Sequence, residues 1–243
     1  MAAEESSPNF GLKEDWSLVE KTLEEIVPVY DKTNRYISLG TDLKLRKRGI
    51  ELLLTEFGTE DFSLMDLGCG TGTMTRMFQE CAKSNDKVTL VDALPSMLKV
   101  ARRRVGQDGV LGVYEALPFR TAVLDAAMSG FSIRDAKDLK AALEQINRLL
   151  KPNGKFLIVD LSKPDSPMKS GLISIYWRIF APLIAFFSVG KLGWKFAALS
   201  KTYSRLPKTS EFIRMAETGG FEIVRCEFSM MGGAGVLLLS KRF

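Results

Sequence analysis

Three alternate glycines follow a short apolar run and have the spacing of a ligand-binding loop. Gly68, Gly70 and Gly72 come directly after the expected strand 64–67 and before a helical pattern. Glycine tolerates positive φ and lets the backbone approach a ligand closely, while the first turn of the next helix offers unpaired N–H groups. The pattern therefore predicts a loop that binds an anionic or nucleotide-like molecule.

Two acidic residues accompany these glycines. Asp66 lies inside the first strand, and Asp92 ends the next strand, about twenty residues further on, where dinucleotide-type folds place a carboxylate for ribose hydroxyls. A tight strand-to-helix turn without a ligand is the alternative, but it leaves both acids unexplained. Because the third glycine comes too early for the dinucleotide fingerprint, the spacing favours S-adenosylmethionine, which lacks a pyrophosphate, over NAD.

The composition limits the chemistry further. The chain has 243 residues and no histidine, so any general base is a carboxylate, Tyr, Lys or water. Its three cysteines lack paired ligand spacing, and we expect no metal site. The net charge of +5 without an aromatic-interleaved basic stripe predicts no nucleic-acid partner. We expect the basic runs 44–48 and 102–104 to be solvated helix faces, with attraction to anionic lipid as the alternative.

Hydrophobic periodicity predicts an α/β fold, with strands separated by amphipathic helices and therefore mostly parallel. We expect strands at 64–67, 88–92, 122–128, 156–159, 221–228 and 235–240, and helices near 16–27, 42–57, 74–81, 94–105, 139–150 and 210–218. The segment 152–154 is expected to end the fifth of these helices. The last two strands are close enough to form an antiparallel hairpin at the sheet edge.

The whole chain, 1–243, is expected to form a single domain. Its parts are an N-terminal helical cap (1–58), a ligand-binding core (59–164), an apolar helical insert (165–208) and a C-terminal helix with the hairpin (209–243). Within the insert, 171–190 approaches the length of a membrane span, but Arg178 and Pro182 weaken that reading. A buried insert, or a lid that covers an apolar substrate or touches a bilayer, remain the alternatives. The acidic N-terminus carries no secretion signal, which predicts a cytoplasmic protein.

Several further motifs carry a resemblance to a known family. They are Tyr30 to Gly40, Glu115 to Phe119, Phe131 to Asp135, Leu149 to Gly154 and Leu161 to Pro164. With the glycine loop, they make the chain resemble the class I S-adenosylmethionine-dependent methyltransferases. Within these it is similar to the UbiE/MenG family, which C-methylates ubiquinone and menaquinone precursors. The resemblance implies a doubly wound, mostly parallel, seven-stranded Rossmann-like sheet with an antiparallel C-terminal hairpin, N-terminal helices and a helical lid.

The resemblance also implies a cofactor site for S-adenosyl-L-methionine, with S-adenosyl-L-homocysteine as product. The glycine loop would follow the methionine and ribose, Asp92 would accept from both ribose hydroxyls, and other contacts would flank the adenine. The implied cofactor residues are Asp66, Gly68, Cys69, Gly70, Gly72, Asp92, Ala93, Met97, Tyr114 and Glu115. The family usually has an acid where Val113 stands, so we expect either weaker cofactor binding here or a backbone carbonyl in place of the acid's hydrogen bond to the adenine amino group.

Methyl transfer to an aromatic carbon needs a deprotonated ring hydroxyl and later removal of the ring proton. Arg134 is a permanent cation suited to the oxyanion, and Asp135 is the expected proton acceptor, with Tyr30 as hydrogen-bonding or stacking partner. Asp135 replaces the family's Asn. The alternative is a surface turn in which Asp135 or Asp138 caps the next helix.

A prenylated quinol is the substrate that the resemblance implies, and its tail needs an apolar channel. The candidate channel residues are Tyr176, Trp177, Phe180 and Met231. Such a substrate favours contact with the inner face of the membrane, while a homodimer is left open. The alternatives are a methyltransferase of the same fold acting on another small phenol, amine or lipid, and a catalytically silent cofactor-binding scaffold.

Overall fold

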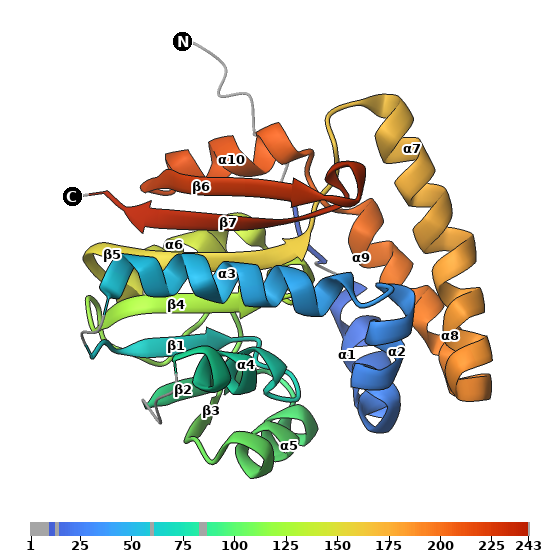
Figure 1. Ribbon diagram of the computed structural model, residues 1–243, viewed down its shortest axis with the longest axis horizontal. Helices are drawn as coiled ribbons and strands as arrows, with labels where there is room; N and C mark the ends of the chain where they lie inside the picture. Colours follow the sequence, from blue (N-terminus) through green and yellow to red (C-terminus); the bar gives the residue numbers. More distant parts are fainter. Residues whose placement is uncertain (1–9, 13–14, 59–60, 83–86, 243) are drawn as a thin grey trace.

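The structure is a computed structural model that describes residues 10–12, 15–58, 61–82 and 87–242. In this part of the chain, seven strands form one sheet in the order β3-β2-β1-β4-β5-β7-β6 (Figure 1). Their bounds are β1 Leu64–Leu67, β2 Val88–Asp92, β3 Gly109–Leu111, β4 Leu124–Gly130, β5 Leu150–Leu161, β6 Phe221–Ser229 and β7 Ala234–Lys241. Neighbours among β1 to β5 are parallel, whereas β7 is antiparallel to β5 and β6. The expected fold class is confirmed.

Helices cover both faces of the sheet because its central strands are apolar on both sides. In β4, Ala126 and Met128 pack into the core under α3 (Thr41–Phe57) and α4 (Thr73–Ala82), whereas Ala127 packs into the core on the opposite face. That second face carries α6 (Leu139–Leu149) and α10 (Thr209–Thr218), and α5 (Pro95–Val105) packs on β2 and β3. Figure 1 shows α3 crossing in front of the strands and α6 and α10 behind them.

Two elements differ from the expectations. The edge strand β3 was not expected, because three residues that begin with glycine show no periodicity. Residues 152–154 do not end a helix: α6 ends at Leu149, and these residues lie inside β5, which starts at Leu150. Asn153 has a φ of 63°, so this turn-like sequence bends the start of the strand.

Within the expected cap 1–58, α3 packs on the sheet, and the name cap is kept below for α1 (Trp16–Ile26), the turn η2 (Val27–Val29) and α2 (Tyr30–Ile37). This cap lies beyond the carboxyl ends of the strands and beside α8 (Ala181–Val189), while α7 (Pro167–Ile175) lies further along the same side of the molecule (Figure 1). The cap and the insert share one apolar cluster, in which Leu23, Ile37, Ala181 and Ala185 are buried. Shorter pieces complete the chain: η3 Ile133–Asp135, the π-helical turn η4 Tyr176–Phe180, η5 Gly190–Leu199, α9 Ser200–Ser204 and η6 Met230–Gly232.

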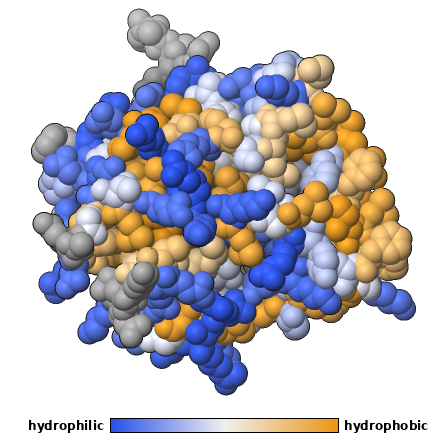
Figure 2. All heavy atoms as spheres, viewed as in Figure 1, coloured by the Kyte–Doolittle hydropathy of each residue, from blue (hydrophilic) through white to orange (hydrophobic). Residues whose placement is uncertain are grey.

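Within the insert, α7, η4 and α8 form a nearly continuous helical rod that ends at Gly190, and η5 folds back against α8. Among the described residues, Pro167–Ala197 is the stretch long and apolar enough to cross a membrane by length and composition, which is weak evidence for a span. One side of the rod packs on the cap, where the Tyr176 hydroxyl donates to the Ile37 carbonyl. The other side leaves large apolar side chains in solvent, which Figure 2 shows as a hydrophobic edge over α7 and α8.

Candidate active site

A cavity of about 410 Å³ lies at the carboxyl ends of β1, β2 and β4, a size typical of small-molecule sites. Its walls come from the loops after these strands, from residues 112–115 and from the cap helices. Loops at this edge of a parallel sheet converge because the strands all end there, which is where α/β folds bind ligands. The glycine loop and both cap helices therefore face one space.

A hydrogen bond to Asp92 fixes the conformation of the glycine loop. Gly68, Gly70 and Gly72 have φ values of 63°, 54° and 82°, which a side chain would strain. The Gly70 N–H donates to Oδ2 of Asp92 at 2.7 Å, and the Leu94 N–H donates to Oδ1 at 2.9 Å. Burial raises the pKa of Asp92, and these amides oppose the rise. The carboxylate thus fixes the loop and still keeps lone pairs for a ligand at the cavity wall.

Asp66 supports the loop from beneath and does not line the cavity. Its Oδ2 accepts from the Thr75 hydroxyl at 2.6 Å and the Thr75 N–H at 3.2 Å, which ties β1 to the start of α4. Its Oδ1 has no hydrogen-bond partner among the described residues. Burial raises the pKa of Asp66 from 3.8 to about 6, although the bonds from Thr75 lower it.

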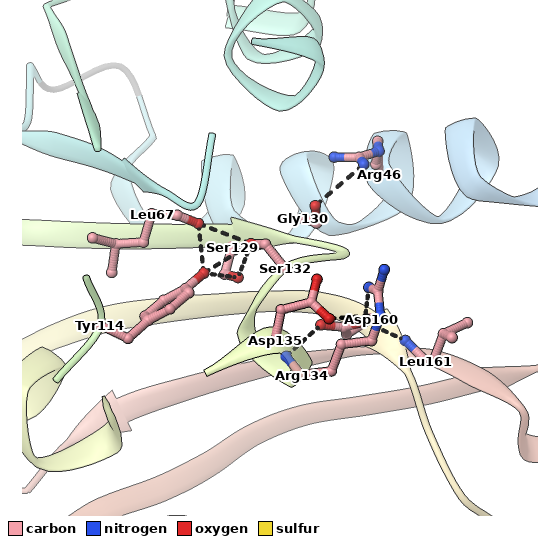
Figure 3. Close-up of polar contacts among 10 residues, drawn as sticks. All are labelled: Arg46, Leu67, Tyr114, Ser129, Gly130, Ser132, Arg134, Asp135, Asp160 and Leu161. Atoms are coloured by element: carbon pink, nitrogen blue, oxygen red, sulfur yellow. Dashed lines mark hydrogen bonds and ion pairs between the residues drawn. The ribbon is translucent and has the colours of Figure 1, made fainter. Parts of the chain in front are cut away.

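Tyr114 closes the floor of the cavity (Figure 3). Its hydroxyl donates to the Leu67 carbonyl at 2.7 Å and lies 2.8 Å from the hydroxyls of both Ser129 and Ser132. Burial raises the pKa of Tyr114 well above its ordinary value, so this hydroxyl stays protonated. A Cβ added to Gly68 would lie 2.5 Å from Ser132 Oγ and 2.8 Å from the Tyr114 hydroxyl, so the floor tolerates only glycine there.

Arg134 is buried in an ion pair on the rear side of the cavity wall. Its Nη1 donates to Asp160 Oδ1 at 2.6 Å, and its Nε lies 3.8 Å from Asp135 Oδ1 (Figure 3). Burial lowers the pKa of Arg134, but the carboxylates of Asp160 and Asp135 outweigh burial and raise it. The expected surface turn is wrong, because the Arg134 and Asp135 side chains are only 9% and 12% exposed, whereas the helix cap expected with it is confirmed at Asp138.

Asp135 and Tyr30 both line the cavity. Asp135 Oδ1 has no hydrogen-bond partner among the residues that the structure describes. Burial raises the pKa of Asp135 from 3.8 to about 6, while the Arg134 cation opposes the rise. Burial also raises the pKa of Tyr30, which keeps its phenol protonated at neutral pH. The wall therefore carries a weakly basic carboxylate beside a hydrogen-bonding phenol.

Arg46 was missed as a site residue. It belongs to the basic run 44–48, which we expected to be solvated, but Arg46 is only 8% exposed and lines the cavity. Its Nη2 donates to the Gly130 carbonyl at 3.2 Å, and its guanidinium lies over the Phe131 ring, 5.0 Å from the centroid. The available signal was its place on the apolar face of α3, next to Leu45 and preceding Gly49 and Ile50.

The comparisons with known proteins agree with this geometry. A family model described as the ubiE/COQ5 methyltransferase family matches residues 10–239. The chain belongs to this family. It is therefore an S-adenosylmethionine-dependent methyltransferase, and the resemblance noted from the sequence motifs is confirmed.

Two relatives and one solved structure illustrate the relationship. A demethylmenaquinone methyltransferase of Listeria welshimeri is 30% identical over 222 residues, covering 89% of this chain and 92% of that protein. A 2-phytyl-1,4-naphtoquinone methyltransferase of Nostoc punctiforme is 28% identical over 232 residues, covering 92% and 98%. The crystal structure of an S-adenosylmethionine-dependent methyltransferase from Thermotoga maritima, named as a possible histamine N-methyltransferase, has a TM-score of 0.61 at 19% identity, covering 94% and 99%. This last likeness concerns the fold.

The methyltransferase brings most of the predicted site residues together. Those that line the cavity are Tyr30, Gly68, Cys69, Gly70, Asp92, Ala93, Met97, Tyr114, Glu115 and Asp135. Glu115 also fixes the chain before α6, because its Oε1 accepts from the Asp138 N–H at 3.0 Å. Asp66, Gly72 and Arg134 lie outside the wall and support it. Among the described residues, no group of three or more acidic or sulfur side chains is arranged to hold a metal ion.

The four predicted substrate residues are not part of this wall. Tyr176 is tied to the cap by its hydroxyl, and the Trp177 ring stacks on Tyr203 with centroids 6.4 Å apart. Phe180 and Met231 are 52% and 60% exposed. Tyr176 and Trp177 do pack against the apolar cluster shared by cap and insert, as Tyr30 does, and Met97 is one of its buried members. Their role in substrate binding remains a prediction.

Proposed function

We propose that this methyltransferase transfers a methyl group to a ring carbon of a quinol with an apolar tail, as the names of its relatives suggest. The observation that carries the proposal is the single cavity. It joins the glycine loop and Asp92 to a weakly basic carboxylate, Asp135, beneath an apolar cap. Because the fold alone does not determine the substrate, the proposal rests on the residues that line this cavity.

The cavity residues fit S-adenosylmethionine. Backbone can approach a ligand closely at Gly68 and Gly70, and Asp92 keeps acceptor capacity for ribose hydroxyls at the rim. Ala93, Met97 and the chain around Tyr114 offer apolar surfaces for adenine. When bound, the cofactor supplies a methyl group already activated by a sulfonium, so the protein mainly has to position the acceptor.

The proposed catalytic steps use few side chains. Methyl transfer forms a bond from carbon to the methyl and breaks its bond to sulfur, and the ring proton then leaves to the Asp135 carboxylate. Tyr30 hydrogen-bonds to or stacks on the acceptor ring. Arg134 acts through its contacts with Asp135 and Asp160, since it is not at the cavity wall, and so holds the proton acceptor in place.

An apolar tail also gives the exposed side of the insert a function. Side chains spaced three or four residues apart form an apolar ridge, which we define as Met168, Leu172, Ile175, Ile179, Leu183 and Phe187, between 37% and 83% exposed. Exposed basic residues interrupt it at Lys169, Arg178 and Lys191. We propose that this ridge rests on the inner face of an anionic membrane, from which the substrate enters.

The proposed function is tested by incubating the purified protein with methyl-labelled S-adenosylmethionine and a reduced demethylmenaquinone. We expect label on the quinol ring, and no label with Asp92→Ala, which loses charge-assisted hydrogen bonds worth about 1.5–3 kcal/mol each. A parallel reaction with a total lipid extract and with small phenols and amines identifies other acceptors. Label only in those products would replace the quinol, and label nowhere with intact cofactor binding would indicate a silent scaffold.

A further inference from the structure

Arg46 is a buried cation that the proposed reaction has so far not used. It is more than nine-tenths buried, and within residues 10–12, 15–58, 61–82 and 87–242 it forms no ion pair with a carboxylate. One of its five N–H groups donates to Gly130, and its Nε has no partner among them. A buried charge is costly unless an opposite charge balances it.

The surroundings fix the guanidinium without a direct ion pair, and the carboxylates of Asp42, Asp66 and Asp160 act on it from a greater distance. The Phe131 ring lies beneath it, and Phe131 itself has a φ of 56°, a strained conformation for an aromatic residue that is common at functional sites. Figure 3 shows Arg46 on α3 on one side of the end of β4 and Asp135 on the other. Both line the cavity, so an acceptor ring there meets a cation on one side and a carboxylate on the other.

We propose that Arg46 binds the deprotonated ring oxygen of the acceptor and is a catalytic residue of this methyltransferase. The inference rests on the proposed function. Arg134 cannot serve equally, because it is paired with Asp160 and Asp135 and does not line the cavity. The methionine carboxylate of the cofactor is the competing anion for Arg46, and pairing with it would weaken cofactor binding in Arg46→Met instead of shifting the ionisation of a bound phenol. An anionic oxygen on the acceptor is the complementary charge.

The proposed methyl transfer begins and ends with the acceptor as an oxyanion bound to Arg46. The ring hydroxyl loses its proton to solvent, and Arg46 stabilises the resulting oxyanion, whose electron pair is shared with the ring carbon. The carbon forms its bond to the methyl as the bond to sulfur breaks, and the oxygen becomes a carbonyl. Asp135 then takes the ring proton, and the electron pair of that C–H bond restores the aromatic oxyanion, which Arg46 binds again.

A phenol probe tests this without turnover. We would titrate 1-naphthol, whose deprotonated form is distinguished by absorbance, in complex with the protein and S-adenosylhomocysteine. Arg46→Met is expected to raise the apparent pKa of bound naphthol by about one unit, equal to a tenfold weaker preference for the anion, and Arg46→Lys to restore part of the shift. The groups that face Arg46, and whose titration must be followed alongside, are Tyr30, Asp42, Asp66 and Asp160.

Two further variants separate charge from packing. A Cβ at position 130 would lie 2.2 Å from Arg46 Nη1, so Gly130→Ala displaces the guanidinium while keeping its charge and should reproduce part of the Arg46→Met shift. Arg48→Met removes an exposed arginine of the same helix, paired with Glu227 at 2.7 Å, and should change nothing. Thermal unfolding confirms that each variant is folded, and weaker cofactor binding in Arg46→Met with an unchanged naphthol pKa would assign Arg46 to the cofactor carboxylate and overturn the inference.

The outcomes are distinguishable. If wild-type protein neither binds naphthol nor methylates a quinol, the proposed function fails. If wild-type protein methylates the quinol and Arg46→Met binds naphthol with an unchanged apparent pKa and turns over at the same rate, Arg46 has no catalytic role and the proposed function stands. A rate lowered with an unchanged naphthol pKa would also overturn the inference, because it assigns Arg46 a structural role only.

Discussion

Asp92 and Asp135, which both line the cavity, differ in the hydrogen bonds that their carboxylate oxygens accept. Both oxygens of Asp92 accept backbone N–H groups, one from Gly70 in the glycine loop and one from Leu94 after β2, which suits a carboxylate that binds without reacting. Asp135 has an unpartnered oxygen among the described residues and a pKa raised to about 6 by burial, against the opposing cation of Arg134. A carboxylate that is ionised at neutral pH and accepts a proton readily is what removal of a ring proton requires.

This difference gives a pH dependence for turnover. The charged form of Asp135 is the proton acceptor and predominates only above its pKa of about 6, so turnover should rise with pH through that value. Asp135→Asn should lower turnover by about 100-fold or more and abolish the acidic limb of the pH profile. Single-turnover rates between pH 5 and 8 measure both effects.

Asp66 provides the control for this profile. Its pKa is also raised to about 6 by burial, so the glycine loop that it supports loses a negative charge in the same pH range. Cofactor affinity must therefore be measured at each pH. An acidic limb that persists in Asp135→Asn and follows cofactor affinity would assign the titration to Asp66 and remove Asp135 from the chemistry.

Arginines were the residues that sequence reasoning placed least well. Arg134 was expected to face the acceptor, yet Asp160, 26 positions away, holds it behind the wall. Arg46 was expected in solvent, yet contacts with Gly130 and Phe131 bury it. Long side chains reach several ångströms from their backbone, so their surroundings depend on segments distant in sequence. Glycines and strand-end acids were easier, because the backbone itself places them.

At the scale of elements, the sequence predicts what periodicity and glycine spacing determine. The central strands, their crossover helices and the terminal hairpin appear where the apolar patterns place them. The edge strand β3 has no such pattern, and it forms because Leu90 to Asp92 offer it a partner. The three-residue helical turn Ile133–Asp135 likewise follows from the burial of Arg134 and Asp135, which a motif alone does not reveal.

Packing between α3 and the sheet yields a prediction about two helical glycines. A Cβ at Gly49 would lie 2.8 Å from Val159 Cγ2 and 3.0 Å from Leu157 Cδ1, whereas nothing lies within 4 Å of a Cβ at Gly171 in α7. Gly49→Ala should lower the free energy of unfolding by about 1–2 kcal/mol, because overpacking exceeds the gain in helix propensity.

Gly171→Ala is the matched control. It gains helix propensity in open space and should raise the free energy of unfolding by up to about 1 kcal/mol. Urea unfolding of the two variants should therefore shift in opposite directions. Equal shifts would show that α3 moves away from the sheet freely, and that its contact does not fix the position of Arg46.

For the whole molecule, the apolar ridge and the cavity lie on two sides of one cap. Cap residues that line the cavity, such as Trp16, Leu23 and Tyr30, belong to the same cluster as Ala181 and Ala185 of the insert. The net charge of +5 adds attraction to an anionic membrane.

Membrane binding by the apolar ridge can be tested by replacing two of its exposed side chains. Ile179 and Phe187 are 49% and 83% exposed, so Ile179→Glu with Phe187→Glu should leave the fold intact. Burying such side chains in a bilayer contributes about 1.5–3 kcal/mol each, so co-sedimentation with phosphatidylglycerol vesicles should weaken by at least about tenfold. Leu111→Glu, at a residue 53% exposed on the far sheet edge, is the control and should sediment like wild type. Unchanged sedimentation of the double variant would contradict membrane contact, and its conversion from dimer to monomer would instead assign the ridge to a second copy of the chain.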